Sequence, residues 1–337
     1  MADAGGHRAG LAVGAHRDRV TDIVEAAFPG CSMSRHPARY ATSHRLDEIE
    51  VRPPGEPPRH LMAKHLGRRA LSEAGRLAKP PALDCTEREL VVYRDILAGA
   101  SLDTPALIGG WADHGEGALV VERVEGSPLS EVGDFRTWMA TSRWLARMHA
   151  TFAEDLPETP LSGPRLSLVR YQRDLLSAAG RRGLCRANER GLGSPQVRAA
   201  LARGHEQAVL TLTSVAPTLV HGDFYPSNIV VSGDRIAVVD WELAGTGPGQ
   251  LDLAALVAGG WDEEQRHALT RAYHDEATAL GPAEPFSVLM QHVRLAILHL
   301  SLRWLGSSPG WEVPADHRRD WFTDAVAALD PLDAGAV

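Results

Sequence analysis

Two short stretches decide the fold of this chain: HGDFYPSN at residues 221–228 and IAVVD at residues 236–240. The first lies between two short apolar runs, and the second is itself an apolar run that ends on Asp240. Short apolar runs bounded by turn residues predict buried strands. We therefore expect Asp223 and Asn228 on a loop between two strands, and Asp240 at the end of a third.

These three polar residues match the requirements of phosphoryl transfer. That reaction needs a group that orients and deprotonates an acceptor hydroxyl, oxygen ligands that hold magnesium against the phosphates, and a cation on the phosphates. Asp223 suits the first task, and Asn228 and Asp240 offer the hard oxygen ligands that Mg²⁺ prefers. Either Asp223 or Asn228 alone would be read as an ordinary turn residue. The spacing of all three favours catalysis.

The same residues carry a family resemblance. The pattern H-G-D, then Asn228 after four residues, then VDWE at residues 239–242, resembles the aminoglycoside phosphotransferase and choline kinase superfamily. The stretches GPGQLDLA at 247–254 and LARMH at 145–149 are similar to further motifs of that family. The resemblance covers about residues 40–305. It implies a two-lobed, protein-kinase-like α+β fold, with a β-rich N-terminal lobe and a mostly helical C-terminal lobe.

The order of predicted elements agrees with two lobes. We expect residues 1–20 to form a flexible extension, residues 21–124 a nucleotide-binding lobe, and residues 125–337 a catalytic and substrate-binding lobe. In the second lobe, periodic apolar residues predict helices over 135–152, 165–179, 195–212, 251–258, 262–280, 285–305 and 315–329. The resemblance further implies that Asp252 braces the catalytic loop and that His149 packs beneath it.

The expected phosphate-binding cation is Lys64. The chain has only two lysines, Lys64 and Lys79, and arginine stands at every other Lys or Arg position. Lys64 ends the apolar run LMA and is predicted to lie at a strand end, whereas Lys79 lies in an exposed-looking stretch before two prolines. In a chain that otherwise uses arginine, a lysine at this position indicates a need for a compact ammonium rather than a planar guanidinium. The resemblance implies Glu89 as the partner of Lys64, with Glu87 as the alternative.

The resemblance also places the nucleotide, ATP or GTP, between the lobes. The backbone from Glu122 to Val124 would hydrogen-bond the purine base, although an ordinary connector between lobes is the alternative. A loop that covers the phosphates is expected at residues 39–44, but this stretch has no glycine. Ser43 still offers a hydroxyl and a backbone donor there.

The overall composition limits the classes of partner that the chain is expected to bind. The net charge is -8, and an acidic chain is a poor general binder of nucleic acid or of anionic membranes. No apolar stretch is long enough to predict a membrane span. The three cysteines form no C-x-x-C pair, which suits a reducing cytoplasm. The expected partners are a nucleoside triphosphate and a small hydroxyl substrate.

The sequence therefore predicts a magnesium-dependent kinase that acts on an aminoglycoside-like antibiotic or a related natural product or metabolite. A protein kinase is one alternative, but the chain has no D-F-G or A-P-E sequence. A kinase-like binding protein without catalysis is another. Such a protein would be expected to lack at least one of Lys64, Asp223, Asn228 or Asp240, and all four are present.

Acidic residues raise the question of a cationic acceptor. Asp262, Glu263 and Glu264, or Glu154 and Asp155, could recognise the ammonium groups of an amino sugar. Each of them could equally be a solvated surface charge, which usually contributes little.

Overall fold

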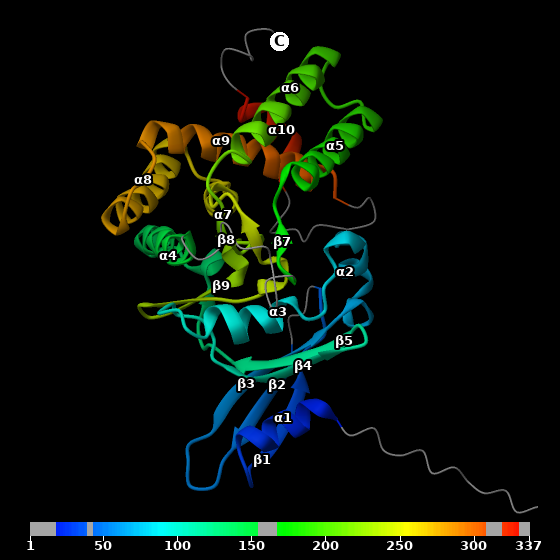
Figure 1. Ribbon diagram of the computed structural model, residues 1–337, viewed down its shortest axis with the longest axis vertical. Coiled ribbons are helices and arrows are strands. Elements are labelled where there is room, and N and C mark those ends of the chain that lie inside the picture. Colours follow the sequence, from blue (N-terminus) through cyan, green and yellow to red (C-terminus); the bar gives the residue numbers. More distant parts are fainter. Residues whose placement is uncertain (1–17, 39–42, 154–166, 308–318, 330–337) are drawn as a thin grey trace, which may run out of the picture.

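The computed structural model describes residues 18–38, 43–153, 167–307 and 319–329, which form two lobes (Figure 1). The first lobe is built on a five-stranded sheet, and the second is mostly helical. The predicted α+β class, with its β-rich first lobe and helical second lobe, is confirmed. Most of the predicted N-terminal extension lies outside the described residues.

The sheet of the first lobe is antiparallel, with strand order β1-β2-β3-β5-β4. Its strands are β1 (Ser32–Pro37), β2 (Leu46–Arg52), β3 (Arg59–Leu66), β4 (Leu107–Asp113) and β5 (Glu116–Glu122). The proline-rich turn after β2 joins it to β3 in a hairpin. The sequence does not predict the two edge strands, because β1 is polar and β4 contains two adjacent glycines.

Successive side chains along each strand point to opposite faces of this sheet. Residues at every second position, including Leu61 of β3, form a core with helix α1 (Arg19–Ala27). The residues between them, including Lys64, face the opposite side. Helix α3 (Arg88–Val91) and the π-helical turn that continues it (Val92–Leu97) lie on that side, next to the helical lobe.

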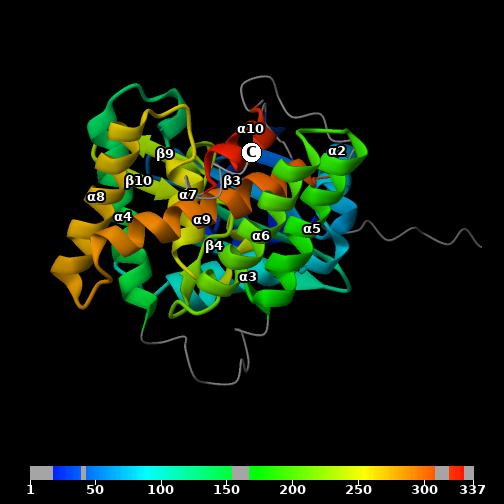
Figure 2. The ribbon, with the colours of Figure 1, turned by 90° about the horizontal axis from the view of Figure 1, so that it is seen from above.

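Helix α9 crosses the middle of the second lobe, with α8 on one side and α5 and α6 on the other (Figure 2). The helices of this lobe are α4 (Phe135–Ala153), α5 (Arg173–Glu189), α6 (Pro195–Leu212), α7 (Gln250–Val257), α8 (Glu263–Leu280), α9 (Phe286–Leu305) and α10 (Trp321–Ala327). The first lobe adds the short α2 (Glu73–Ala78). The predicted helix over 165–179 is wrong in its bounds, because strand β7 (Val169–Arg170) precedes α5. Of the helix predicted over 315–329, the described residues form a helix only in α10.

Two small sheets position the predicted catalytic stretches. One contains β6 (Ser127–Pro128), β9 (Ile229–Ser232) and β10 (Arg235–Val238), and the other contains β7, β8 (Thr218–Val220) and β11 (Gly245–Gly247). The stretch 221–228 joins β8 to β9, and Asp240 follows the end of β10. This is the arrangement that the sequence predicts. No helix within the described residues is long and apolar enough to cross a membrane.

Arg88 ties the two lobes together. Its side chain is buried, and its Nε donates to the Ser167 carbonyl at 2.6 Å. Its Nη1 donates to the carbonyls of Leu83, at 2.9 Å, and Glu242, at 2.7 Å. Leu83 belongs to the first lobe, whereas Ser167 and Glu242 belong to the second. A buried carbonyl left without a donor costs about 1–3 kcal/mol, so these bonds fix one lobe against the other.

We expect Arg88→Leu to lower the free energy of unfolding by about 2–4 kcal/mol, because it removes the donor from three carbonyls. Arg94→Leu is the matched control. Arg94 lies six residues along the same helical segment, is exposed and pairs with its neighbour Asp95. Its loss should cost less than about 0.5 kcal/mol. Urea unfolding of both variants measures the difference, and equal losses would contradict the role given to Arg88.

Candidate active site

Asp252 holds the loop at residues 221–228 by its main chain. Its buried carboxylate accepts hydrogen bonds from the backbone N–H of His221, at 2.6 Å, and of Gly222, at 2.9 Å. His149 lies beneath it, with Nε2 3.4 Å from Asp252 Oδ2. The bracing role of Asp252 and the position of His149, both implied by the family resemblance, are confirmed.

His221 and Gly222 shape the start of the loop. His221 is fully buried and donates from Nε2 to the Val239 carbonyl at 2.9 Å, while Nδ1 accepts from the Asp223 N–H at 3.3 Å. Burial lowers the pKa of His221, which suits this neutral pattern of one donor and one acceptor. Gly222 has a φ of +78°, and a Cβ there would lie 2.1 Å from the Tyr171 hydroxyl. Only glycine fits this position.

Asp223 is partly exposed at the junction of the lobes, with 26% of its side chain accessible. The Asn228 side-chain amide donates to the Asp223 carbonyl at 2.9 Å and to its Oδ2 at 3.2 Å. Arg303 Nη2 lies 3.8 Å from Oδ1. Burial raises the pKa of Asp223 to about 7; Arg303 opposes this shift, and the nearby carboxylates of Asp240 and Glu242 add to it. The sequence does not predict that Arg303, in the last turn of α9, lies at this site.

Asn228 and Asp240 are brought together by the β9–β10 hairpin. The Val239 N–H donates to the Asn228 carbonyl at 2.9 Å, and Asp240 follows directly in a left-handed backbone conformation with φ +68°. Because the Asn228 amide nitrogen is turned to Asp223, its oxygen has no hydrogen-bond partner among the described residues. One amide oxygen and one carboxylate, completed by phosphate oxygens and water, are a donor set that suits Mg²⁺. No group of three or more His, Cys, Asp or Glu residues that could hold a metal occurs in the described parts of the chain.

Lys64 lies inside β3 rather than at a strand end, so that detail of the prediction is wrong. Its Nζ is 2.7 Å from Glu89 Oε2 and 2.5 Å from Asp240 Oδ1. Glu89 is buried, whereas the alternative partner Glu87 is exposed. Burial favours loss of the Lys64 proton, but Asp240, Glu89 and Glu242 outweigh it and raise the pKa of Lys64 well above its usual value. The ammonium is therefore charged and stands beside the candidate metal ligand.

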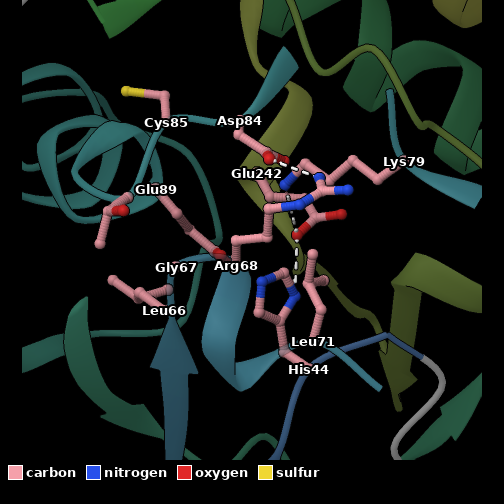
Figure 3. A pocket seen from close by; sticks show the side chains of 11 residues that line it. His44, Leu66, Gly67, Arg68, Leu71, Lys79, Asp84, Cys85, Glu89 and Glu242 are labelled. Carbon is pink, nitrogen blue, oxygen red and sulfur yellow. Dashed lines mark hydrogen bonds and ion pairs between the residues drawn. The ribbon is translucent and has the colours of Figure 1, made fainter. Parts of the chain in front are cut away.

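Both lysines of the chain meet at Glu242. Its Oε2 lies 3.7 Å from Lys64 Nζ, 3.3 Å from Lys79 Nζ and 3.0 Å from His44 Nδ1. Figure 3 shows the His44 ring directed at the Glu242 carboxylate, at one side of a small pocket that Lys79 also lines. Burial raises the pKa of Glu242, but Lys64, His44 and Lys79 together lower it below its usual value.

The prediction that Lys79 is exposed is wrong, because only 12% of its side chain is accessible. Its approach to Glu242 depends on a fold contact between residues 163 positions apart. Only the position of Glu242, two residues after Asp240, could have suggested that it belongs to the site.

The predicted base-binding segment is partly engaged by the protein itself. The Glu122 N–H donates to the Ala106 carbonyl at 2.8 Å, and the Arg123 N–H donates to the His60 carbonyl at 2.9 Å. The Glu122 carboxylate accepts two bonds from Arg235, at 2.6 and 3.0 Å, and so anchors the segment to the helical lobe. Among the described residues none bonds to the Val124 backbone. Of these three backbone N–H groups, the one at Val124 is therefore the one that no described residue engages.

Ser43 stands at the edge of the described chain, after residues 39–42, which lie outside it. Its carbonyl accepts a bond from the Ser72 N–H at 2.7 Å, and its Oγ lies 3.3 Å from His44 Nδ1. Ser43 is thereby joined to the cluster of His44 and Glu242. The expectation that residues 39–44 cover the phosphates falls largely on residues that are not described.

Comparison with known proteins identifies relatives of this architecture. A sequence model described as the phosphotransferase enzyme family matches residues 75–286, and no curated protein matches the chain. A microcompartment-associated aminopropanol kinase is similar at 15% identity and TM-score 0.58, covering 95% of each chain. A choline kinase from Cryptosporidium parvum Iowa II is similar at 12% identity and TM-score 0.57, over 92% of this chain and 93% of that one.

A third similar structure is a mutant aminoglycoside 2'-phosphotransferase IIIa in complex with GDP. It is 14% identical, with a TM-score of 0.57, over 94% of this chain and 96% of that one. At such low identity these likenesses establish the fold. The two-lobed, protein-kinase-like fold that the family resemblance implies is confirmed.

The two lysines should differ in their effect on phosphoryl transfer. We expect Lys64→Arg to lower turnover at least about 10²-fold, because a planar guanidinium cannot keep the contacts of the ammonium with Glu89 and Asp240. Lys79→Arg keeps a positive charge near Glu242 and should cost less than about 10-fold. Steady-state nucleotide turnover of both variants, with thermal unfolding as the check on folding, measures this difference. Equal and mild losses would show that Lys64 is not the cation on which transfer depends.

Proposed function

Because the chain belongs to the phosphotransferase enzyme family, we propose that it is a small-molecule kinase that transfers the γ-phosphoryl group of ATP or GTP to a hydroxyl group. The observation that carries the proposal is the cluster in which Asn228 contacts Asp223, and Lys64 contacts Asp240, at the junction of the lobes. The acceptors to consider are aminoglycoside-like antibiotics and related natural products or metabolites. Similar structures are named as kinases of aminopropanol, choline and an aminoglycoside.

Each residue of the cluster has a role in this proposal. Asp223 orients the acceptor hydroxyl and takes its proton, while the Asn228 amide holds the Asp223 carboxylate in place. Asn228 and Asp240 are the proposed ligands of Mg²⁺, which when bound neutralises charge on the phosphates. Lys64, kept in position by Glu89, contacts the phosphates.

The base and the outer phosphates would be held by the first lobe. The Val124 N–H is the proposed donor to adenine or guanine, next to the anchored Glu122. Ser43 is the proposed donor from the loop over the phosphates. The GDP complex of a similar structure supports a nucleotide as the phosphoryl donor, without deciding between ATP and GTP for this chain.

A binding protein without catalysis is the alternative of a different class. It would bind nucleotide without consuming it, whereas a kinase releases ADP or GDP in proportion to acceptor phosphorylated. A protein kinase would phosphorylate peptides. Measuring nucleotide consumption with a small-molecule panel and a peptide panel separates the three, and consumption only with peptides would contradict our proposal.

Asp223→Asn tests the proposed general base. Asparagine keeps the size of the side chain but cannot accept the proton, so we expect turnover to fall by about 10²–10⁴-fold. Nucleotide affinity should change little, because Lys64, Val124 and the metal ligands are retained. Turnover and nucleotide binding are measured on the same purified variant. Near-normal turnover would remove Asp223 from the mechanism, and loss of folding would show that it serves the turn.

Metal removal tests the oxygen ligands. We expect EDTA to abolish nucleotide turnover and added Mg²⁺ or Mn²⁺ to restore it, because oxygen donors favour these ions. Asp240→Asn should raise the Mg²⁺ concentration needed for half-maximal turnover, since it replaces a charged ligand with a neutral one. Turnover that survives complete chelation would contradict the proposed metal site.

A further inference from the structure

Two consecutive residues in the last turn of α9, Arg303 and Trp304, both bind the loop that carries Asp223. Arg303 Nη1 donates to the Gly222 carbonyl at 3.2 Å, and Trp304 Nε1 donates to the Tyr225 hydroxyl. Gly222 directly precedes Asp223, and Tyr225 follows it by two residues. The end of α9 therefore holds this loop on both sides of the proposed general base.

The peptide group between Gly222 and Asp223 has both of its polar atoms engaged. Its carbonyl accepts the bond from Arg303, and its N–H, which belongs to Asp223, donates to His221 Nδ1 at 3.3 Å. The N–H of Gly222 itself donates to the buried Asp252 carboxylate at 2.9 Å. The backbone before Asp223 is therefore fixed from α7 through Asp252 and from α9 through Arg303.

The two carboxylate oxygens of Asp223 have different neighbours. Oδ2 accepts the Asn228 amide at 3.2 Å, whereas no described residue donates a hydrogen bond to Oδ1. Arg303 Nη2 lies 3.8 Å from Oδ1, which is within the range of an ion pair but too long for a hydrogen bond. Oδ1 is therefore the better candidate for the oxygen that accepts the hydroxyl proton, and Arg303 lies beside it.

Arg303 also balances charge at Asp223. Two other carboxylates, those of Asp240 and Glu242, are close enough to act on Asp223 electrostatically. Within the described parts of the chain, the cation in ion-pair contact with Asp223 is Arg303. Because this contact is attractive, it restrains the Asp223 side chain against repulsion from the two neighbouring carboxylates.

A guanidinium suits this position because it carries its terminal nitrogens at a fixed separation. One of them, Nη1, binds the Gly222 carbonyl, while the other, Nη2, lies next to Asp223 Oδ1. Lysine ends in a single nitrogen on a flexible chain, so it cannot hold both groups in the same way. An arginine also stays charged, since its guanidinium is not deprotonated in proteins.

We propose that Arg303 is a positioning residue for phosphoryl transfer, and that Arg303 and Asn228 together hold the Asp223 carboxylate with Oδ1 towards the acceptor hydroxyl. This inference rests on the proposed kinase function. In the transfer, the acceptor oxygen bonds to the γ-phosphorus, its proton passes to Asp223, and the nucleoside diphosphate leaves with the electron pair of the broken bond. Arg303 keeps its own protons throughout.

The role of Arg303 concerns Asp223 itself and holds for any hydroxyl acceptor. Of the acidic residues considered from the sequence for a cationic acceptor, Asp262 caps α8, and the two residues after it are exposed. The other acidic pair, at 154–155, lies outside the described residues.

The test compares the intact protein with Arg303→Lys and Arg303→Met. Mg²⁺-dependent consumption of ATP and of GTP is measured with water as the acceptor and with each member of the small-molecule panel. We expect kcat to fall at least about 10-fold in Arg303→Lys and about 10²-fold in Arg303→Met, because a misplaced catalytic group costs about this much. The KM for the nucleotide should change less than about 3-fold, since Lys64 and the metal ligands are retained.

Arg266→Met is the matched control. Arg266 of α8 also donates to two main-chain carbonyls of the helical lobe, those of Val257 at 3.4 Å and Trp261 at 3.1 Å. We place it outside the cluster around Asp223, so its loss should leave kcat within about 2-fold of that of the intact protein. Thermal unfolding of all the variants shows whether any loss of turnover follows from loss of folding.

The outcomes distinguish the two proposals. If the intact protein consumes no nucleotide with water or with any member of the panel, the kinase function is contradicted and the role of Arg303 falls with it. Consumption by the intact protein with an unchanged kcat in both Arg303 variants would overturn the role of Arg303 and leave the kinase function standing. A change confined to the nucleotide KM, an equal loss of kcat in Arg266→Met, or failure of both Arg303 variants to fold would overturn that role as well.

Discussion

The carboxylates of Glu89, Asp223, Asp240 and Glu242 lie close enough together at the junction of the lobes to act on one another electrostatically, and the rest of the site depends on keeping them there. Carboxylates at such distances repel one another, and burial adds the cost of desolvation. Lys64 offsets part of this by contacting Glu89 and Asp240. Burial raises the pKa of Asp223, and the nearby Asp240 and Glu242 carboxylates add to this shift while Arg303 opposes it. A divalent cation bound there would relieve that repulsion.

The structure resists this repulsion mainly through bonds to backbone atoms. Asp252 accepts hydrogen bonds from the N–H groups at the start of the loop at residues 221–228, and His221 joins that loop to the segment before Asp240. Arg88 brings the lobes into contact through carbonyls. Each of these side chains is buried, where a hydrogen bond is stronger and its loss costs more. The main chain around Asp223 and Asp240 is thereby fixed by buried side chains.

The sequence predicts the site residues that lie close together along the chain, and it misses those that tertiary packing brings in from distant segments. Asp223, Asn228 and Asp240 lie within 18 consecutive residues and are joined by one hairpin, so their spacing carries the information. Glu89 was predictable only through family resemblance. Arg303 and Lys79 approach the site from distant segments, and nothing in their neighbouring residues marks them. Strands β1 and β4 escape prediction for a related reason, since an edge strand needs no apolar alternation to pair with its neighbour.

The contacts of Arg88 have a consequence for how such a protein can diverge. The carbonyl oxygens that it binds belong to Leu83, Ser167 and Glu242, yet a carbonyl is present whatever side chain stands at those positions. Mutational drift at Leu83 or Ser167 would therefore leave the junction between the lobes intact. A single arginine can therefore preserve the contact between the lobes of this protein while the side chains at those positions change.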